Sequence, residues 1–341
     1  MNLEQFFPMQ LKSRLCLTIW GKYTDYWKSS NNKSMIIETE NKGIALITAM
    51  MIVAIVGLVT TNLLWESALN TRKTSSTLNR DQAVQIAIGV EKWVTNLLKQ
   101  DSLSSDSDHL NEFWARELPS LPIDGGFISG QIHDLQGRFN LNNLVNKDGS
   151  INQDQVDYFQ RFLTALNINP TIANSVIDWI DDDQYTTYPN GAEDDFYTRM
   201  NPPYRTANRE MITISELLSV RSIDQEIFNQ IKPYISAIPE ITKINVNTAS
   251  HVILKSLGDE ITINDIERLE NERVPSGFID VATSFESLID NEYIYNISGN
   301  SNYFQLELLV NIDNISIIMY STIHRGSGGN TSILSRSFGT I

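Results

Sequence analysis

The longest uncharged stretch of the chain runs from Ile44 to Trp65 and is almost entirely apolar. As a helix, its roughly 22 residues would extend about 33 Å, close to the ~30 Å hydrocarbon thickness of a bilayer. A buried core helix and a cleaved signal peptide are the alternatives. Core helices seldom contain about 18 or more consecutive apolar residues, and no small-x-small cleavage site follows the run. The pattern therefore predicts one membrane-spanning helix over residues 44–65.

The polarity pattern changes after residue 65, but nothing interrupts the helix. Residues 66–100 contain no proline, and apolar side chains recur there every three or four positions, which places them on one helical face. This stripe consists of Ala83, Ala87, Val90, Val94 and Leu97. The segment is therefore predicted to be an amphipathic stem helix that continues the membrane-spanning helix and packs on a domain.

A strand pattern follows the stem. Residues 127–143 alternate in polarity around Gln136-Gly137, which predicts a β-hairpin. Helical patterns come next, at residues 152–166 and 170–180.

The end of the chain is again β-rich. The predicted strands cover residues 293–297, 303–311 and 315–324, and Asp313-Asn314 is a plausible hairpin turn between the last two. We expect these strands to pair with the hairpin of residues 127–143 and to close a sheet over the stem. Residues 333–341 form either a short final strand or a frayed tail.

Composition and charge limit the kinds of partner. The chain has 341 residues, 41% of them hydrophobic, which is enough for one large domain or two small ones. The formal net charge is −15; residues 1–43 have six Lys and Arg against four Asp and Glu, so the remainder carries −17. A surface this acidic repels phosphate backbones and suits cationic or metal partners.

Residues 1–43 look like a leader that the mature protein does not need. They contain no long apolar run and hold the only cysteine, Cys16. Met35 is an alternative start that would leave a short polar leader ending at Gly43. Without this segment the protein has no cysteine, which excludes disulfides, a thiolate nucleophile and cysteine ligation of a metal.

An acidic loop follows the predicted helix at residues 170–180. Seven carboxylates lie within 18 positions around Pro189-Asn190-Gly191, namely Asp178, Asp181, Asp182, Asp183, Glu193, Asp194 and Asp195. So many negative charges repel one another unless water or a cation separates them. Oxygen donors without nearby histidine or cysteine favour Ca²⁺ over Zn²⁺. A solvated acidic loop is the alternative, although interleaved aromatic residues indicate an ordered loop.

A membrane-tethered metal-dependent hydrolase is a second interpretation of the acidic loop. It would need a general base beside the carboxylates, but the four histidines lie elsewhere, at positions 109, 133, 251 and 324. We therefore expect no enzymatic activity and no catalytic residue.

A membrane-anchored nucleic-acid-binding protein is a third interpretation. Residues 247–250, Asn-Thr-Ala-Ser, resemble the helix-hairpin-helix repeat of DNA receptors, in which a Gly-rich hairpin and a helix N-terminus hold a phosphate. The corresponding hairpin here, residues 257–260, is acidic and has one glycine, so we expect no nucleic-acid partner. We expect instead that Asn247 or Thr248 caps a helix that packs through its apolar residues. These residues are Val252, Ile253 and Leu257.

The junction Lys42-Gly43, followed by an apolar helix and an amphipathic stem, resembles the N-terminus of type IV pilins and pseudopilins. In that family a prepilin peptidase cleaves after the glycine and methylates the new terminal amine. The resemblance implies cleavage after Gly43 and methylation of Ile44. Most members have Glu at the fifth mature position, where this chain has Thr48. That carboxylate would pair with a neighbouring subunit's amine, since an unpaired charge in lipid is costly.

A subunit without this carboxylate needs no neighbouring subunit above it. In lacking the carboxylate, the chain resembles the K-type minor pseudopilin of the type II secretion system. The acidic region is also similar to that family. The matching residues are, in order, Asp178-Trp179-Ile180-Asp181, Gly191-Ala192-Glu193-Asp194, Tyr197, Pro202-Pro203-Tyr204-Arg205, Asn208 and Ile214-Ser215-Glu216-Leu217.

The resemblance implies an α+β fold, in which a pilin-like long N-terminal helix packs on an antiparallel sheet that carries a large inserted all-α domain. The expected segments are a leader at 1–43, a membrane-spanning half-helix at 44–65, a stem at 66–100, the first part of the pilin-like domain at 101–150, the inserted domain at 151–290 and C-terminal strands at 291–341. The family also implies two calcium ions, with Tyr204 and Arg205 bracing the loop. The implied oxygen donors are Asp178, Asp181, Asp183, Glu193, Asp194 and Asn208.

The implied function is that of a tip subunit, which nucleates a pseudopilus that supports export of folded proteins across the outer membrane. Its expected partners are the I- and J-type minor pseudopilins, the major pseudopilin through the N-terminal helix, the prepilin peptidase and the inner-membrane assembly platform. The expected location is the bacterial inner membrane, with one span and the C-terminal domain in the periplasm.

Overall fold

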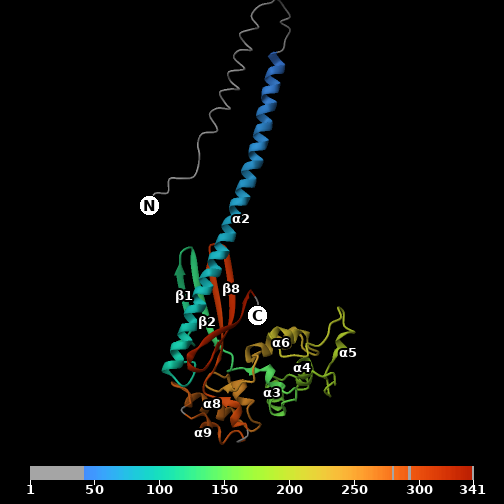
Figure 1. Ribbon diagram of the computed structural model, residues 1–341, viewed down its shortest axis with the longest axis vertical. Helices are drawn as coiled ribbons and strands as arrows, with labels where there is room; N and C mark the ends of the chain where they lie inside the picture. Colours follow the sequence, from blue (N-terminus) through green and yellow to red (C-terminus); the bar gives the residue numbers. More distant parts are fainter. Residues whose placement is uncertain (1–41, 279, 291–292, 340–341) are drawn as a thin grey trace, which may run out of the picture. The chain divides into compact units, whose positions relative to one another are not determined.

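The computed structural model describes residues 42–278, 280–290 and 293–339 (Figure 1). Residues 1–41 of the predicted leader, with Cys16 and the alternative start at Met35, lie outside these residues. The α-helices are α2 Lys42–Ser104, α3 Gln153–Ala165, α4 Ile172–Ile180, α5 Asp194–Tyr197, α6 Gln225–Ile231, α7 His251–Lys255, α8 Ile263–Glu272 and α9 Val281–Phe285. The strands are β1 Leu118–Ile123, β2 Gly126–Asp134, β3 Phe139–Asn140, β4 Ile235–Ser236, β5 Ile244–Asn245, β6 Ile297–Ser298, β7 Tyr303–Ile312, β8 Ile315–Arg325 and β9 Thr331–Phe338. The 3-10 helices are η1 Leu141–Leu144, η2 Ile214–Ser219, η3 Lys232–Tyr234, η4 Ile294–Asn296 and η5 Ser327–Gly329.

The predicted membrane-spanning segment and stem form one continuous helix. α2 begins at Lys42 and ends at Ser104, four residues beyond the predicted end of the stem. The chain divides into two compact units after Thr71. In the first unit the apolar side chains of residues 44–65 are exposed, and this helix is long and apolar enough to cross a membrane. Lipid or neighbouring helices must cover such a surface in the cell.

The part of α2 that belongs to the second unit packs on an antiparallel sheet with strand order β1-β2-β7-β8-β9. Ala83 and Ala87 are fully buried and let the helix approach the strands closely, while Val94 and Leu98 fill the space further along. Val90 and Leu97 are partly buried. The predicted stripe is therefore confirmed, and Leu98 adds a fully buried residue to it.

The predicted hairpin over residues 127–143 is wrong in its second arm. β2 pairs with β1 through a two-residue turn at Asp124-Gly125, in which Gly125 has φ +80°. On its other side β2 pairs along its whole length with β7. The expected second arm contains β3, which pairs in parallel with β4. The two prolines of β1 are typical of an edge strand and hid it in the sequence pattern.

Two of the three predicted C-terminal strands are confirmed. β7 and β8 form a hairpin around Asp313-Asn314, and both strands pair as expected within the sheet. The last segment forms β9, so the strand alternative holds there. The strand predicted at residues 293–297 is wrong. That segment forms η4 and the two-residue β6, because its apolar side chains pack on the inserted domain instead of the sheet.

Between β2 and β7 the chain forms a mainly helical inserted domain with its own hydrophobic core. α3 and α4 confirm the two helices predicted at residues 152–166 and 170–180. Phe139, Phe159 and Phe162 are stacked within this core, with ring centroids 4.9 and 5.8 Å apart. The ends of the insertion are adjacent, because the Leu135 amide donates to the Tyr303 carbonyl at 3.0 Å.

Buried asparagines at the start of the insertion hold distant backbone segments. Asn142 donates from Nδ2 to the carbonyls of Met211 and Ile238 and accepts the Met211 amide on Oδ1 at 2.8 Å. Asn140 accepts the Ile238 amide on Oδ1 at 2.9 Å. Since buried backbone groups need partners, these side chains replace a regular sheet ladder at this junction.

A buried ion-pair group fixes the end of α2 to β8. Arg325 donates to Asp101 at 3.0 Å and to Asp108 at 2.6 Å. Burial raises the pKa of Asp101 to about 6, and Glu112 and Asp108 add to the rise, although Arg325 opposes it. Because a buried charge without its partner is strongly destabilising, these ion pairs hold the end of α2 against β8.

Candidate metal centre

Three carboxylates of the predicted acidic loop meet in the inserted domain. Asp181 ends α4, Asp183 follows in the loop, and Glu193 directly precedes α5. One oxygen of each lies within 4.8 Å of the others. Oxygens that bind one calcium ion at about 2.3–2.6 Å lie at most about 5 Å apart. The three side chains therefore fit around a single ion.

Several buried oxygens of this group, and one of Asn208, have no hydrogen-bond partner within the described part of the chain. They are both carboxylate oxygens of Glu193, Oδ1 of Asp181 and Oδ1 of Asn208. Asn208 is oriented by its Nδ2, which donates to the Asp183 carbonyl at 3.1 Å. Buried polar atoms are normally satisfied, and a buried carboxylate without a cation is costly. An oxygen-only donor set with unsatisfied anionic oxygens fits a hard cation such as Ca²⁺ or Mg²⁺.

The two other predicted donors make contacts that hold the loop. Asp178, buried in the last turn of α4, accepts the Thr187 amide at 3.1 Å on both carboxylate oxygens. Asp194 accepts the amide and hydroxyl of Thr206 on Oδ1, and its Oδ2 lies 3.6 Å from Arg205 Nη1. Both lie outside the group of three carboxylates. Calcium binding by Asp178 and Asp194, and the binding of a second calcium ion, therefore stay predictions.

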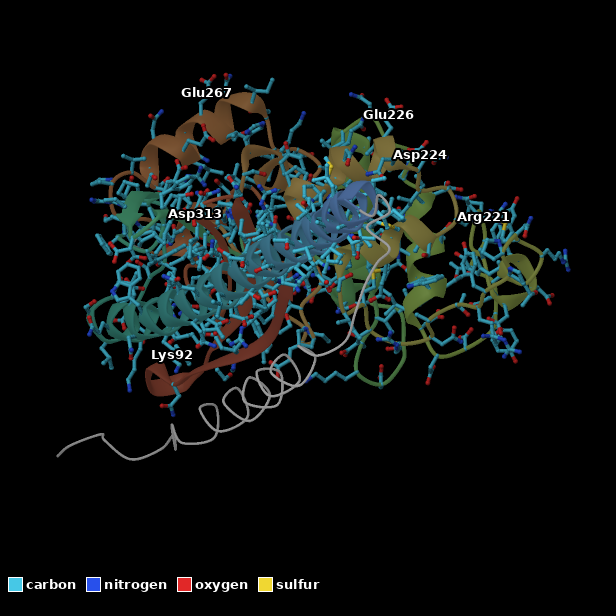
Figure 2. The ribbon with its side chains drawn as sticks, turned by 90° about the horizontal axis from the view of Figure 1, so that it is seen from above. Lys92, Arg221, Asp224, Glu226, Glu267 and Asp313 are labelled. Atoms are coloured by element: carbon cyan, nitrogen blue, oxygen red, sulfur yellow. The ribbon has the colours of Figure 1, made fainter. Side chains whose placement is uncertain are left out.

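The loop is braced by residues that the sequence did not single out. Arg221, labelled in Figure 2, donates from Nη1 to the Gly191 carbonyl at 3.0 Å, and Ser175 donates from Oγ to the Asn190 carbonyl at 2.6 Å. A Cβ at Gly191 would lie 2.3 Å from Asp178 Oδ2, so only glycine fits there. The glycine within the acidic cluster was the one available sequence signal for this close approach.

Tyr204 and Arg205 lie as expected for bracing residues. The Tyr204 ring packs on Trp179 and Tyr197, with centroids 6.3 and 5.2 Å away, and its hydroxyl donates to the Ser219 carbonyl. Arg205 lies beside Asp194. The aromatic residues between the carboxylates thus form the packed base of an ordered loop.

Burial and mutual repulsion raise the pKa values of Asp181 and Glu193 when no cation is bound. Burial raises the pKa of Asp181 to about 7, and the neighbouring Asp183 and Asp178 add to the rise. Burial raises the pKa of Glu193 to about 8, with Asp178 and Asp181 adding to it. A cation would therefore compete with protons near neutral pH.

Without metal, the protein is expected to lose stability as pH rises from about 4.5 to 8. The pKa values of Asp181 and Glu193 are higher in the folded chain than their ordinary values of 3.8 and 4.5. The folded state therefore binds more protons in this window, and the stability that this provides at low pH is lost as pH rises through the folded-state values. Melting temperatures in excess EDTA should be lower at pH 8 than at pH 6.

The double variant Asp181→Asn/Glu193→Gln is the control for this pH dependence. It cannot ionise at the two positions, so its melting temperature in EDTA should change less between pH 6 and pH 8. An undiminished pH dependence in the double variant would assign the effect to other groups.

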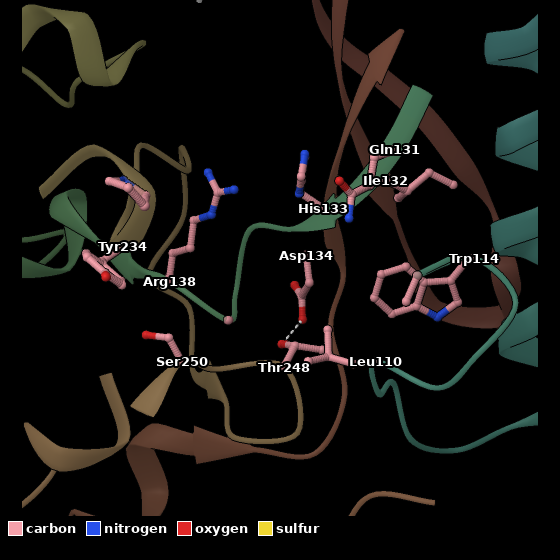
Figure 3. Close-up of a pocket in the computed structure, with 13 residues that line it drawn as sticks. Leu110, Trp114, Gln131, Ile132, His133, Asp134, Arg138, Tyr234, Thr248 and Ser250 are labelled. Atoms are coloured by element: carbon pink, nitrogen blue, oxygen red, sulfur yellow. Dashed lines mark hydrogen bonds between the residues drawn. The ribbon is translucent and has the colours of Figure 1, made fainter. Parts of the chain in front are cut away.

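The segment around residues 247–250, which resembles part of a DNA receptor, makes hydrogen bonds to another buried carboxylate. Asp134, at the end of β2, accepts on Oδ2 from Asn245 Nδ2, the Thr248 hydroxyl and the Ser301 hydroxyl. Figure 3 shows the hydrogen bond from Thr248. Burial raises the pKa of Asp134, while the hydrogen bonds from Ser301 and Thr248 oppose the rise. The polar residues of the motif thus join the sheet, the inserted domain and the segment before β7. His133, beside it, is a strand residue of β2.

The predicted helix cap at Asn247 or Thr248 is wrong. Ser250 caps α7, and its Oγ accepts the Ile253 amide at 3.4 Å. Thr248 is held by Asp134, and Asn247 accepts the Phe278 amide, so neither side chain is available to α7. The apolar packing of α7 is as expected. Ile253 and Leu257 are buried, and Val252 is partly buried.

A long N-terminal helix that is apolar in its first half and packed on an antiparallel sheet in its second half defines a pilin-like subunit. The chain belongs to the type II secretion system protein K family, because it is 32% identical to a protein of that name over 87% of its own length. The family model described as type II secretion system protein K matches residues 137–240, which include the acidic loop. Members of this family are pseudopilin components of the secretion system and are not known as enzymes.

Relatives and a solved structure agree with this assignment. The chain is 32% identical to type II secretion system protein K of Pseudomonas aeruginosa, over 87% of this chain and 92% of the relative. It is 26% identical to that of Aeromonas hydrophila, over 86% and 96%. One chain of the GspK-GspI-GspJ complex from the enterotoxigenic Escherichia coli type 2 secretion system is 25% identical, with a TM-score of 0.71 over 79% of this chain and all of that chain.

Proposed function

We propose that this protein is the subunit at the tip of the type II secretion pseudopilus, where it nucleates assembly and thereby supports export of folded proteins. The observation that carries the proposal is the single helix α2. Its apolar first part is exposed and its later part is packed on the sheet of the same chain. One helix can therefore insert into the membrane and also carry the folded domain. A packing helix of this kind can leave the bilayer when neighbouring helices replace lipid around it.

Thr48 supports a position without a neighbour above. Its hydroxyl donates to the Ala45 carbonyl of the same helix at 3.0 Å. The polar atom at the fifth mature position is therefore satisfied within its own chain, whereas a carboxylate there would need a cationic partner.

The protein in this proposal spans the inner membrane once, with residues 66–341 in the periplasm. The prepilin peptidase cleaves after Gly43 and methylates Ile44, and the assembly platform then extends the filament below the tip. Calcium in the acidic loop holds the inserted domain in its folded form. The carboxylates without partners at Asp181 and Glu193 support the calcium assignment.

The I- and J-type minor pseudopilins are the proposed direct partners, and the major pseudopilin joins through the N-terminal helix. The similar solved structure from Escherichia coli is a complex of GspK with GspI and GspJ, which supports this choice of partners. Affinity-tagged full-length protein, solubilised from membranes that contain the I- and J-type proteins, should retain both through washing.

The control for this pull-down is an unrelated tagged single-span protein from the same membranes, which should retain neither. Recovery of neither minor pseudopilin with the tagged chain would overturn the proposed role.

A further inference from the structure

A cavity of about 260 Å³ lies on the sheet face that points away from α2. In β8, Ser321 points toward α2 and donates to Glu91, so its neighbours Tyr320 and Thr322 point to the opposite face. These two residues form part of the cavity floor. The complete floor consists of Gln305, Tyr320, Thr322, Ser335 and Ser337, and the roof consists of residues 212–214 and 235–237 of the inserted domain.

Arg138, in the connection between β2 and β3, forms one wall of this cavity. It makes no hydrogen bond or ion pair with any residue in the described ranges, although Asp134 and Glu307 attract its charge. Burial lowers the pKa of its guanidinium. The same side chain lines a second, smaller cavity of about 140 Å³ (Figure 3). A largely buried guanidinium has several N–H donors that need acceptors.

The remaining lining combines an unsatisfied hydroxyl with apolar surface. Ser236 is buried, and its Oγ has no partner among the described residues. Ile212, Ile214 and Ile235 supply apolar walls. The described lining residues include no Asp or Glu, and the other cation, Arg336, is already paired with Glu91. Arg138 is therefore the cation available to a ligand in this cavity.

The edge strand β9, beside the cavity, can also pair with an extended peptide. β9 lies at the edge of the sheet and contributes Ser335, Arg336 and Ser337 to the lining. An edge strand presents unpaired backbone groups, which bind extended peptides by strand addition.

We propose that the Arg138 cavity binds the carboxylate of an extended peptide that has an aliphatic residue beside it. The guanidinium of Arg138 receives the carboxylate in a bidentate arrangement, and the isoleucines cover the aliphatic side chain. The volume fits one or two residues. The carboxylate comes from a peptide C-terminus or from a glutamate side chain, and both present the same group to Arg138.

The test measures fluorescence polarisation with full-length protein in nanodiscs and three labelled peptides. The first ends in Ile-Val with a free C-terminus, the second is its C-terminal amide, and the third is an amide with Glu beside Ile. Binding of the first or third should exceed binding of the second by about tenfold, since a charge-assisted pair replaces a neutral contact. Preference for the first assigns the C-terminus, and preference for the third assigns the side chain.

Variants locate the binding. Arg138→Gln should remove the carboxylate preference without unfolding, because Arg138 has no ion pair to lose, and Arg138→Lys should restore part of it. Thr322→Tyr, which fills the cavity from its floor, should weaken all binding. Arg268→Gln, an exposed arginine of α8, is the matched control and should bind as the unaltered chain does. Equal binding of all three peptides, or a preference that survives Arg138→Gln, would overturn the proposal.

Discussion

Calcium at about 100 times its dissociation constant is expected to raise the melting temperature of residues 66–341 by roughly 5 to 10 °C at pH 8. Binding at that excess contributes about 2.7 kcal/mol, and each kcal/mol shifts the transition by about 2–4 °C in a domain of this size. The physical cause is the group of Asp181, Asp183 and Glu193, whose mutual repulsion the ion removes. Differential scanning calorimetry with calcium and with EDTA measures the shift.

Two variants separate the ion from general charge effects. Glu193→Gln should abolish the calcium response and raise the melting temperature in EDTA at pH 8, because it removes a buried charge that has no partner. Asp195→Asn changes an exposed carboxylate in the same loop and should leave the response intact. Identical melts in calcium and EDTA for the unaltered chain would reject the calcium site.

Replacement of Gly43 by leucine is expected to reduce processing of the precursor by roughly 100-fold or more, if the peptidase pocket accommodates only a residue without a side chain. Gly43 is exposed, and a Cβ there would meet no atom within 4 Å. The substitution therefore leaves the fold undisturbed, and a loss of processing reports on the peptidase. Pulse-chase labelling and gel mobility of precursor and mature forms measure the ratio.

Gly57 provides the matched control. It lies in the same apolar helix, and a Cβ there would also meet no atom within 4 Å. Gly57→Leu should be processed normally. Normal processing of Gly43→Leu would reject Gly43 as the cleavage position.

Local patterns in the sequence were sufficient for α2, α3 and α4 and for part of the sheet. The stem stripe, α3, α4 and the β7–β8 hairpin depend on periodicity and turn residues that lie within a few positions of one another. The pairing of β2 with β1 and β7 was not visible in this way. A strand pattern identifies a strand but not its partner, and the prolines of β1 disguised the edge strand.

The candidate metal site was predictable in composition but not in geometry. The density of carboxylates identified the loop, yet only the fold distinguishes Asp181, Asp183 and Glu193, which meet, from Asp178 and Asp194, which bind backbone amides or neighbouring side chains. Two residues that brace the loop carry no local signal of that role: Arg221 lies 30 positions after its partner Gly191, and Ser175 lies in α4, 15 positions before its partner Asn190. Thr248 was misjudged because its partner Asp134 is more than a hundred positions away.

The adjacency of Leu135 and Tyr303 has a consequence for how the chain acquires its fold. β2 and β7 are central neighbours in the sheet, yet Asp134 pairs with Phe304, 170 positions later. Closing so long a loop costs entropy before any strand contact repays it, and contacts of this separation slow folding. The inserted domain has its own core, so we expect its collapse to bring the two strand ends together and to shorten the search. We therefore expect the inserted domain to help the sheet form, because its own folding would bring β2 and β7 close enough to pair.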